Sequence, residues 1–268
     1  MTSSAALTRY VRSADGTRIA YDRQGSGPGV ILVGGAMQFR GFDATTVEMA
    51  GLLADSGFTV INFDRRGRGA SEAAPPISLA ATIADIAALA AELDGPVTLF
   101  GNSSGGSISL AAAAAGVPVS HLVLFEVPLG DENGRDGADF LTGLRAAIAG
   151  GDGEAVVSYF MKDMPPEWLT GARNSPGWPV MVGMGPSLEA DAESIAWTQS
   201  APRQQLWTAV TQPTLVLVGS QTMPKMTTAA QSMVQSLPDA RMRSMGAVQH
   251  GWSPAEMAGL IAEFVRNH

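Results

Sequence analysis

The stretch Val97-Thr98-Leu99-Phe100-Gly101-Asn102-Ser103-Ser104-Gly105 decides how this chain folds and where its chemistry lies. Its first four residues predict a short strand, and the alanine-rich segment that begins at Ser104 predicts a helix. A serine between such a strand and helix, with a glycine two positions before it and two after, is typical of a strained turn that exposes the hydroxyl as a nucleophile. The alternative is a glycine-rich turn that only closes the packing between strand and helix.

Strand-like and helix-like segments alternate on both sides of this turn. Strands are expected at Thr8–Arg12, Thr17–Arg23, Val30–Val33, Phe58–Phe63, Val97–Phe100, Leu122–Phe125, Thr214–Val218 and Arg241–Met245. Helices are expected at Thr45–Asp55, Leu79–Leu93, Ser104–Ala115, Thr227–Leu237 and Pro254–Val265. Strands joined by helices of this length pair in parallel through right-handed crossovers. The pattern predicts an α/β fold with a doubly wound, mostly parallel sheet that follows an antiparallel hairpin.

The alternation stops between about Gly130 and Arg203, where glycine, proline, tryptophan and methionine occur in short irregular groups. Helical periodicity is visible in this part of the chain only near Phe140–Ile148 and Ala192–Ser200. We therefore expect one α/β core formed by residues 1–128 and 206–268. A cap inserted at residues 129–205 is expected to interrupt it.

The composition makes several classes of function improbable. The chain has 268 residues, of which 46% are hydrophobic, as in ordinary globular proteins. With 17 basic and 25 acidic residues, its net charge of −8 disfavours nucleic acid and anionic membranes as partners. It has no cysteine and only three histidines, so we predict no metal site. The sequence contains neither a secretion signal pattern nor a membrane-spanning apolar stretch, and we expect a cytoplasmic protein.

A serine nucleophile needs a general base, because its hydroxyl is protonated at neutral pH. His250 follows the last expected strand, and such a loop returns to the C-terminal edge of a parallel sheet, where Ser103 lies. The other reading is a solvated loop histidine. His268 ends the sequence and His121 begins a strand on the far side, so His250 is the predicted base.

Two backbone N–H groups are candidates for an oxyanion hole. The N–H of Ser104 lies at the start of the predicted helix, where free N–H groups and the helix dipole favour negative charge. The turn Gly34-Gly35-Ala36-Met37 directly follows the strand Val30–Val33 and is expected to supply the second donor. Ala36 is the first choice for that donor and Gly35 the second. The alternative is a plain turn at the end of a strand.

Nearly the whole chain resembles the α/β-hydrolase superfamily. The resemblance rests on the hairpin, the glycine turn, the motif Asp64-Arg65-Arg66-Gly67-Arg68-Gly69-Ala70-Ser71, the serine turn, the inserted cap and the late histidine. It implies the α/β-hydrolase fold, with an eight-stranded sheet, a helical cap and a catalytic triad in the order serine, acid, histidine. In most members the acid is an aspartate after the penultimate strand, but Thr222 stands at that position here.

The triad acid is therefore expected elsewhere. Glu126 ends the strand that neighbours the nucleophile strand, and a carboxylate between Phe125 and Val127 would be costly to bury without a partner. We predict that it pairs with His250. The alternatives are an outward-turned Glu126 on the rim of the loop, or an acid from the following segment: Asp131, Glu132 or Asp139.

The chain is similar to zearalenone lactonases and small actinobacterial α/β hydrolases in four features taken together. These are the serine turn, the glutamate of Glu126-Val127-Pro128, the missing aspartate and the Trp-Pro pair of the cap. That resemblance implies a triad of Ser103, His250 and Glu126, with Trp178 of the cap contacting the substrate. We further expect four residues to line the substrate site: Met37, Pro128, Met161 and Met164.

These inferences predict a hydrolase that cleaves a hydrophobic carboxylic ester or lactone through an acyl-enzyme, without a cofactor. Its partner would be that small molecule, and we expect a monomer or homodimer. Two alternatives remain. One is a non-hydrolytic enzyme on the same fold, such as a C–C lyase or an epimerase, and the other is a protein that only binds a hydrophobic ligand.

Overall fold

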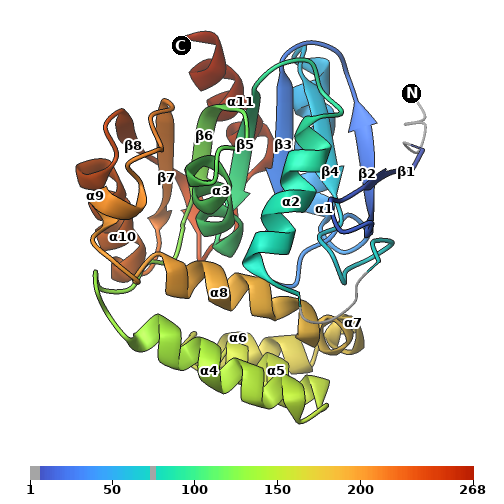
Figure 1. The fold of residues 1–268 in the computed structure, drawn as a ribbon, viewed down its shortest axis with the longest axis vertical. Helices are drawn as coiled ribbons and strands as arrows, with labels where there is room; N and C mark the ends of the chain where they lie inside the picture. Colours follow the sequence, from blue (N-terminus) through green and yellow to red (C-terminus); the bar gives the residue numbers. More distant parts are fainter. Residues whose placement is uncertain (1–6, 73–76) are drawn as a thin grey trace.

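The computed structural model describes residues 7–72 and 77–268, and its described strands form one sheet of eight in the order β1-β2-β4-β3-β5-β6-β7-β8 (Figure 1). From β4 to β8 the neighbours are parallel, whereas β2 is antiparallel to both β1 and β4. This confirms the mostly parallel sheet and its antiparallel hairpin. The strands are β1 (Arg9–Arg12), β2 (Arg18–Gln24), β3 (Gly29–Val33), β4 (Thr59–Phe63), β5 (Val97–Asn102), β6 (Val119–Phe125), β7 (Thr214–Gln221) and β8 (Ala240–Val248).

Helices cover both faces of the sheet, as the doubly wound pattern requires. One face packs against α1 (Ala44–Asp55) and α11 (Pro254–Arg266). The other packs against α2 (Leu79–Ala90), α3 (Ser104–Ala114) and α10 (Pro224–Ser236). Every residue of β3, β4 and β5 is buried, which explains why these strands are nearly continuous apolar runs in the sequence. No described helix is long and apolar enough to cross a membrane.

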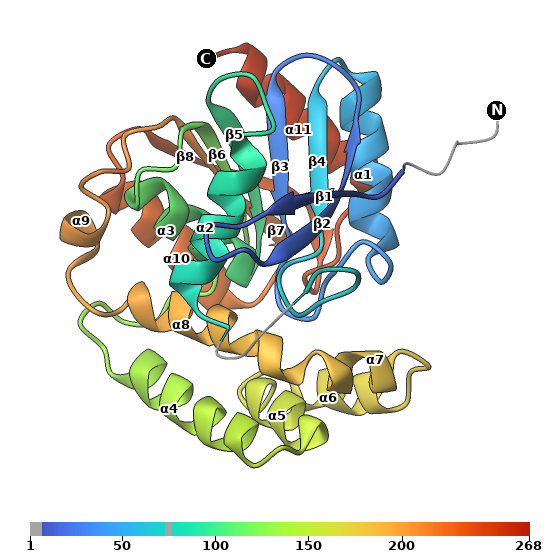
Figure 2. The same ribbon diagram turned by 45° about the vertical axis from the view of Figure 1, so that its right-hand side comes forward.

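The segment between β6 and β7 is far more helical than the sequence pattern suggests. Figures 1 and 2 show its helices from α4 to α8 gathered beyond one end of the sheet, whereas α9 lies beside the core. The expected pieces Phe140–Ile148 and Ala192–Ser200 overlap with α4 and α8, but the helices between these two were not predicted from the sequence. This segment contains α4 (Asp136–Ala149), α5 (Gly153–Phe160), α6 (Pro166–Arg173), α7 (Trp178–Gly183), the 3-10 helix η1 (Gly185–Leu188), α8 (Glu189–Trp197) and α9 (Arg203–Leu206).

The helices that were not predicted are short, and residues at their N-termini stabilise the first turn. The Asp152 side chain accepts hydrogen bonds from two N–H groups in the first turn of α5. Helix α6 begins at Pro166, and α7 has Pro179 in its first turn. Their prolines and glycines resemble loop signals along the sequence. Their apolar side chains nevertheless meet in a separate hydrophobic cluster with Met37.

Candidate active site

The turn between β5 and α3 has the strained geometry expected for a nucleophile. Ser103 has φ 54° and ψ −128°, a backbone conformation that residues other than glycine seldom adopt. A Cβ on Gly105 would lie 2.1 Å from the Val33 carbonyl oxygen, and one on Gly101 would lie 2.5 Å from Gly106 Cα. Helix α3 can therefore pack close to β3 and β5 only because both positions are glycine.

Replacing Gly105 by alanine is therefore expected to destabilise the fold by about 3 kcal/mol or more, because the added methyl group meets backbone atoms that cannot turn away. Gly259 in α11 is the matched control, since a Cβ there would meet nothing within 4 Å. Its replacement by alanine should stabilise the protein by up to about 1 kcal/mol through helix propensity. Urea unfolding of both variants measures the two effects. Equal stabilities would show that the close approach at Gly105 does not constrain the turn.

Glu126 and His250 form a hydrogen-bonded pair. His250 Nδ1 lies 2.5 Å from one carboxylate oxygen, Oε2, and the Gly219 N–H donates to the other, Oε1, at 3.0 Å. Glu126 is only 1% exposed. Burial opposes its ionisation, but the hydrogen bonds from His250 and Gly219 outweigh that effect and lower the pKa of Glu126 below its ordinary value. The carboxylate is thus ionised at neutral pH and can accept a hydrogen bond from the Nδ1–H group of His250.

The topology explains why Glu126 can reach His250 although it follows β6. Strand β6 pairs with β7 in parallel, and Glu126 follows it directly, beside the Gly219 backbone of β7. Thr222 follows β7, so the position where most of the superfamily has an aspartate carries no charge. His250 itself stacks on Phe125, the last residue of β6, with the ring centroids 5.5 Å apart. The end of β6 therefore both supports the imidazole and pairs with it.

The three alternative acids and the strand histidine that the sequence offers lie away from the cavity. Asp131, Glu132 and Asp139 are exposed, and Glu132 accepts a hydrogen bond from the Arg203 N–H. The His121 ring packs against Phe264. Of these residues, none lines the cavity that His250 lines.

Strained backbone is concentrated at this site. Among the described residues other than glycine, six have a positive φ, and all except Asn133 lie at or next to the site. The five are Met37, Ser103, Glu126, Gln249 and His250. Such conformations persist only where the surroundings impose them, and they are common at active sites. Here they occur in the loops after β3, β5, β6 and β8, which meet at one edge of the sheet.

A cavity of about 540 Å³ opens at this edge and is lined by both Ser103 and His250. No hydrogen bond joins these two described residues. Catalytic hydrogen bonds often become short only when a substrate binds, so their shared cavity is the informative observation. Most of the lining is apolar. Of the predicted substrate-site residues, it includes Met37, Pro128, Met161 and Met164.

The tryptophan expected in the cavity is a different one. Trp178 is not among the lining residues. It packs in the apolar cluster of the inserted segment, and the Arg173 guanidinium lies 5.9 Å from its ring centroid. Trp168 in α6 lines the cavity instead, with its ring centroid 6.4 Å from that of His250. The group Met164-Pro165-Pro166-Glu167-Trp168 was visible in the sequence. Only the packing of the helices, however, determines which of the two tryptophans reaches the cavity.

The turn after β3 lies close to the nucleophile, and its N–H groups are not equivalent. A Cβ on Gly35 would lie 2.9 Å from the Asn102 carbonyl oxygen, so only glycine allows this approach. The Gly35 N–H donates to Gln38 Oε1 at 2.6 Å and is not free to bind an oxyanion, which removes Gly35 from the predicted donors. Ala36 and Ser104 line the cavity, and the N–H of neither donates to another described residue.

Comparison with known proteins places the chain in a family. The model of the alpha/beta hydrolase family matches residues 30–264. No curated protein sequence matches significantly. Among solved structures, an alpha/beta hydrolase from Sphaerobacter thermophilus shares 34% identity over 96% of this chain and 100% of that chain, with a TM-score of 0.84. An enol-lactonase from Burkholderia xenovorans, at 20% identity over 97% and 98% of the two chains and a TM-score of 0.65, shares the fold.

The family match extends from β3 to the last helix, and it therefore includes every loop that brings a residue to the cavity described above. The sheet order and the strained serine turn agree with it. This chain belongs to the α/β hydrolase family.

Proposed function

We propose that the protein hydrolyses a hydrophobic carboxylic ester or lactone, with Ser103 as nucleophile, His250 as general base and Glu126 as the triad acid. The observation that carries the proposal is the arrangement of the three residues. An ionised, buried Glu126 accepts a hydrogen bond from the Nδ1–H group of His250, and that imidazole lines the same cavity as a strained serine. A serine, a histidine and a carboxylate in this relation are the components of acyl transfer.

In the first half of the reaction, Ser103 Oγ attacks the carbonyl carbon as His250 Nε2 takes the hydroxyl proton. Glu126 keeps the other ring proton on Nδ1, which leaves Nε2 free to accept, and it stabilises the imidazolium that forms. The N–H groups of Ala36 and Ser104 bind the oxyanion of the tetrahedral intermediate. His250 then gives its proton to the alcohol oxygen as the carbon–oxygen bond breaks.

In the second half, water attacks the acyl-enzyme. His250 takes a proton from the water and returns it to Ser103 Oγ as the acid leaves. With a lactone, the alcohol released in the first half stays attached to the acyl group, so a single ring-opened product leaves after hydrolysis.

The cavity supports a hydrophobic substrate of moderate size. Its volume of about 540 Å³ falls within the usual range of small-molecule sites. Methionine and aromatic side chains provide an adaptable apolar wall, with Met161 and Met164 on one stretch and Phe140, Phe160 and Trp168 around them. An esterase from Thermogutta terrifontis and the Burkholderia enol-lactonase share the fold. Esters, small lactones and macrolactones, including resorcylic macrolactones of the zearalenone type, are the substrates to test.

Covalent labelling tests the proposal without knowledge of the natural substrate. We expect a fluorophosphonate to modify the protein once, at Ser103, and p-nitrophenyl esters to release a burst of p-nitrophenolate equal to the enzyme concentration when deacylation is slow. Mass spectrometry of peptides locates the label. An unlabelled serine, together with tight binding of a hydrophobic ligand and no product, would contradict the proposal and indicate a binding protein. A C–C lyase or an epimerase would form no acyl-enzyme from these esters.

A further inference from the structure

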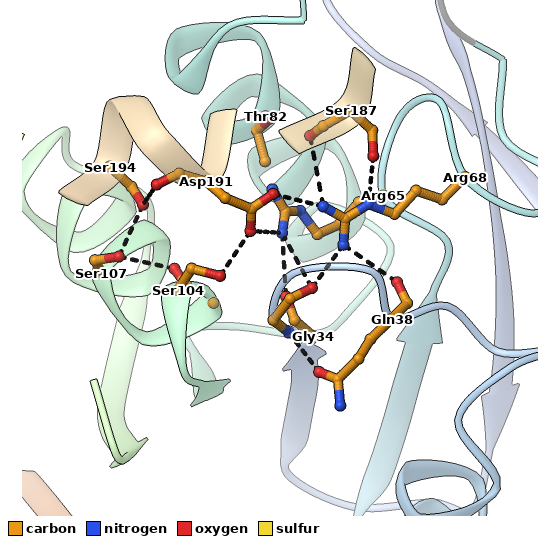
Figure 3. A network of polar contacts seen from close by, with 12 residues as sticks. Gly34, Gln38, Arg65, Arg68, Thr82, Ser104, Ser107, Ser187, Asp191 and Ser194 are labelled. Carbon is orange, nitrogen blue, oxygen red and sulfur yellow. Dashed lines mark hydrogen bonds and ion pairs between the residues drawn. The ribbon is translucent and has the colours of Figure 1, made fainter. Parts of the chain in front are cut away.

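A buried ionic network lies behind the proposed oxyanion hole (Figure 3). Its centre is Asp191 on α8, which is 0% exposed. Arg65 Nη1 donates to Asp191 Oδ1 at 2.7 Å, and Arg68 Nη2 donates to Asp191 Oδ2 at 2.5 Å. Both arginines are buried as well, and they come from the loop after β4. A helix from the inserted segment is thus bound to the core by ionic contacts from which water is excluded.

One side of this network reaches the residue after the nucleophile. Ser104 Oγ donates to Asp191 Oδ1 at 2.6 Å. Ser104 is the first residue of α3, and its backbone N–H is one of the two proposed oxyanion donors. Because a hydrogen bond to a charged acceptor is stronger than one between neutral groups, Asp191 holds the start of α3 firmly.

The other side reaches the peptide that carries the second donor. Arg68 Nη1 donates to the Gly35 carbonyl oxygen at 2.6 Å, and Arg65 Nη1 donates to the Gly34 carbonyl oxygen at 3.3 Å. The Gly35 carbonyl and the Ala36 N–H belong to the same planar peptide, and in a trans peptide the two point in opposite directions. A cation bound to the carbonyl therefore turns the Ala36 N–H away from itself. It also polarises the peptide, which strengthens that N–H as a donor.

The charges of the three ionic groups do not cancel. Two guanidinium groups face one carboxylate, which leaves one net positive charge behind the turn. Burial and the neighbouring Arg65 lower the pKa of Arg68 to about 10, against the opposing effect of Asp191, so Arg68 remains protonated at neutral pH. The two guanidinium groups outweigh the burial of Asp191 and lower its pKa. A fixed positive charge here favours a transition state that develops negative charge at the same turn.

We propose that Asp191, Arg65 and Arg68 are positioning residues that hold and polarise both donors of the oxyanion hole. This proposal rests on the proposed ester or lactone hydrolysis and adds to it that a helix of the inserted segment completes the catalytic geometry. The competing explanation is that the network only fastens α8 to the core. A second buried ion pair, Arg66 with Asp85, allows the two explanations to be separated, because neither of its partners forms a hydrogen bond with residues 34–36 or with Ser104.

The experiment compares Asp191→Asn with the matched control Asp85→Asn on a p-nitrophenyl ester and on its thionoester, in which sulfur replaces the carbonyl oxygen. Oxyanion donors bind developing charge on oxygen much better than on sulfur, so the ratio of the two rates reports on the hole itself. We expect Asp191→Asn to lower kcat for the ester by about 10- to 100-fold, with little change in KM. This loss is smaller than the loss in kcat that follows removal of an oxyanion donor itself. The ratio of the ester rate to the thionoester rate should fall as well.

Asp85→Asn should lower the melting temperature by a comparable amount but keep the wild-type rate ratio. A wild-type ratio in folded Asp191→Asn would overturn the positioning role and leave hydrolysis intact. Wild-type protein that neither turns over an ester nor reacts with a fluorophosphonate at Ser103 would overturn both proposals. These outcomes distinguish the two failures.

A gentler pair of variants covers the case in which Asp191→Asn does not fold. Ser104→Ala keeps the backbone N–H but removes the hydroxyl that binds Asp191, and its control is Ser109→Ala, which removes an equally buried hydroxyl from the same helix. We expect a reduced rate ratio for Ser104→Ala only. Equal, wild-type ratios for both variants would contradict the role of Asp191 at Ser104.

Discussion

Replacing Ser103 by alanine is expected to abolish ester hydrolysis, with a fall in kcat of about 10⁶-fold, the loss typical of a missing nucleophile in a serine triad. The alanine variant has no oxygen to form the acyl-enzyme, and the remaining His250 and Glu126 have no proton to move. The strained turn is retained, since alanine has the same Cβ as serine. Steady-state kinetics with p-nitrophenyl esters, together with loss of fluorophosphonate labelling, measure the effect.

Ser109→Ala serves as the control for this substitution. It removes a buried hydroxyl on α3 that donates to the Gly105 carbonyl within the helix at 2.7 Å and has no other hydrogen bond to a described residue. Near wild-type turnover is expected. Wild-type turnover by Ser103→Ala would contradict the assignment of Ser103 as nucleophile and would indicate that the Glu126–His250 pair activates water directly.

Replacing Glu126 by glutamine is expected to lower kcat by about 10⁴-fold while the fold is kept, as when a triad carboxylate becomes an amide. The reason lies in the second hydrogen bond of Glu126. Because the Gly219 N–H donates to Oε1, the amide oxygen of glutamine should take that position and leave its NH₂ group facing His250 Nδ1. Nδ1 must then accept, the ring proton moves to Nε2, and the imidazole can no longer take a proton from Ser103.

Asp131→Asn is the matched control, since it neutralises an exposed carboxylate that follows the same strand without contacting His250. Its kcat should barely change. Nuclear magnetic resonance of the imidazole nitrogens would reveal the exchanged tautomer in Glu126→Gln. A larger loss in Asp131→Asn than in Glu126→Gln would place the triad acid in the inserted segment.

Much of the core could be predicted because its signals are local. The apolar runs of β3, β4 and β5 show fully buried parallel strands, and the serine turn depends on Gly101 and Gly105, which lie in the same few residues. The pairing of Glu126 with His250 also followed from the sequence, although the two are 124 positions apart. A carboxylate between two buried apolar residues needs a partner, and only one of the three histidines lies at that edge of the sheet.

The inserted segment was predicted less well because its helices depend on contacts with one another. Isolated helices of six to nine residues, such as α5 to α8, are too short to be stable alone, and their packing is what maintains them. Their prolines mark helix starts rather than loops. Consequently the resemblance to known lactonases pointed to Trp178 as the tryptophan that contacts the substrate, whereas the fold brings Trp168 to the cavity.

The sequence by itself determined the α/β core, the strained serine, and the histidine and glutamate of the site. The core and the serine turn follow from residues near one another along the chain. The histidine and glutamate follow from the requirement that a buried carboxylate has a hydrogen-bonding partner. Only the tertiary structure decided which N–H groups remain free and what lies behind them. Asp191 is 126 positions from Arg65, and no local rule pairs them. Burial decides that pairing, because two guanidinium groups enclosed by protein must find a carboxylate that is enclosed with them.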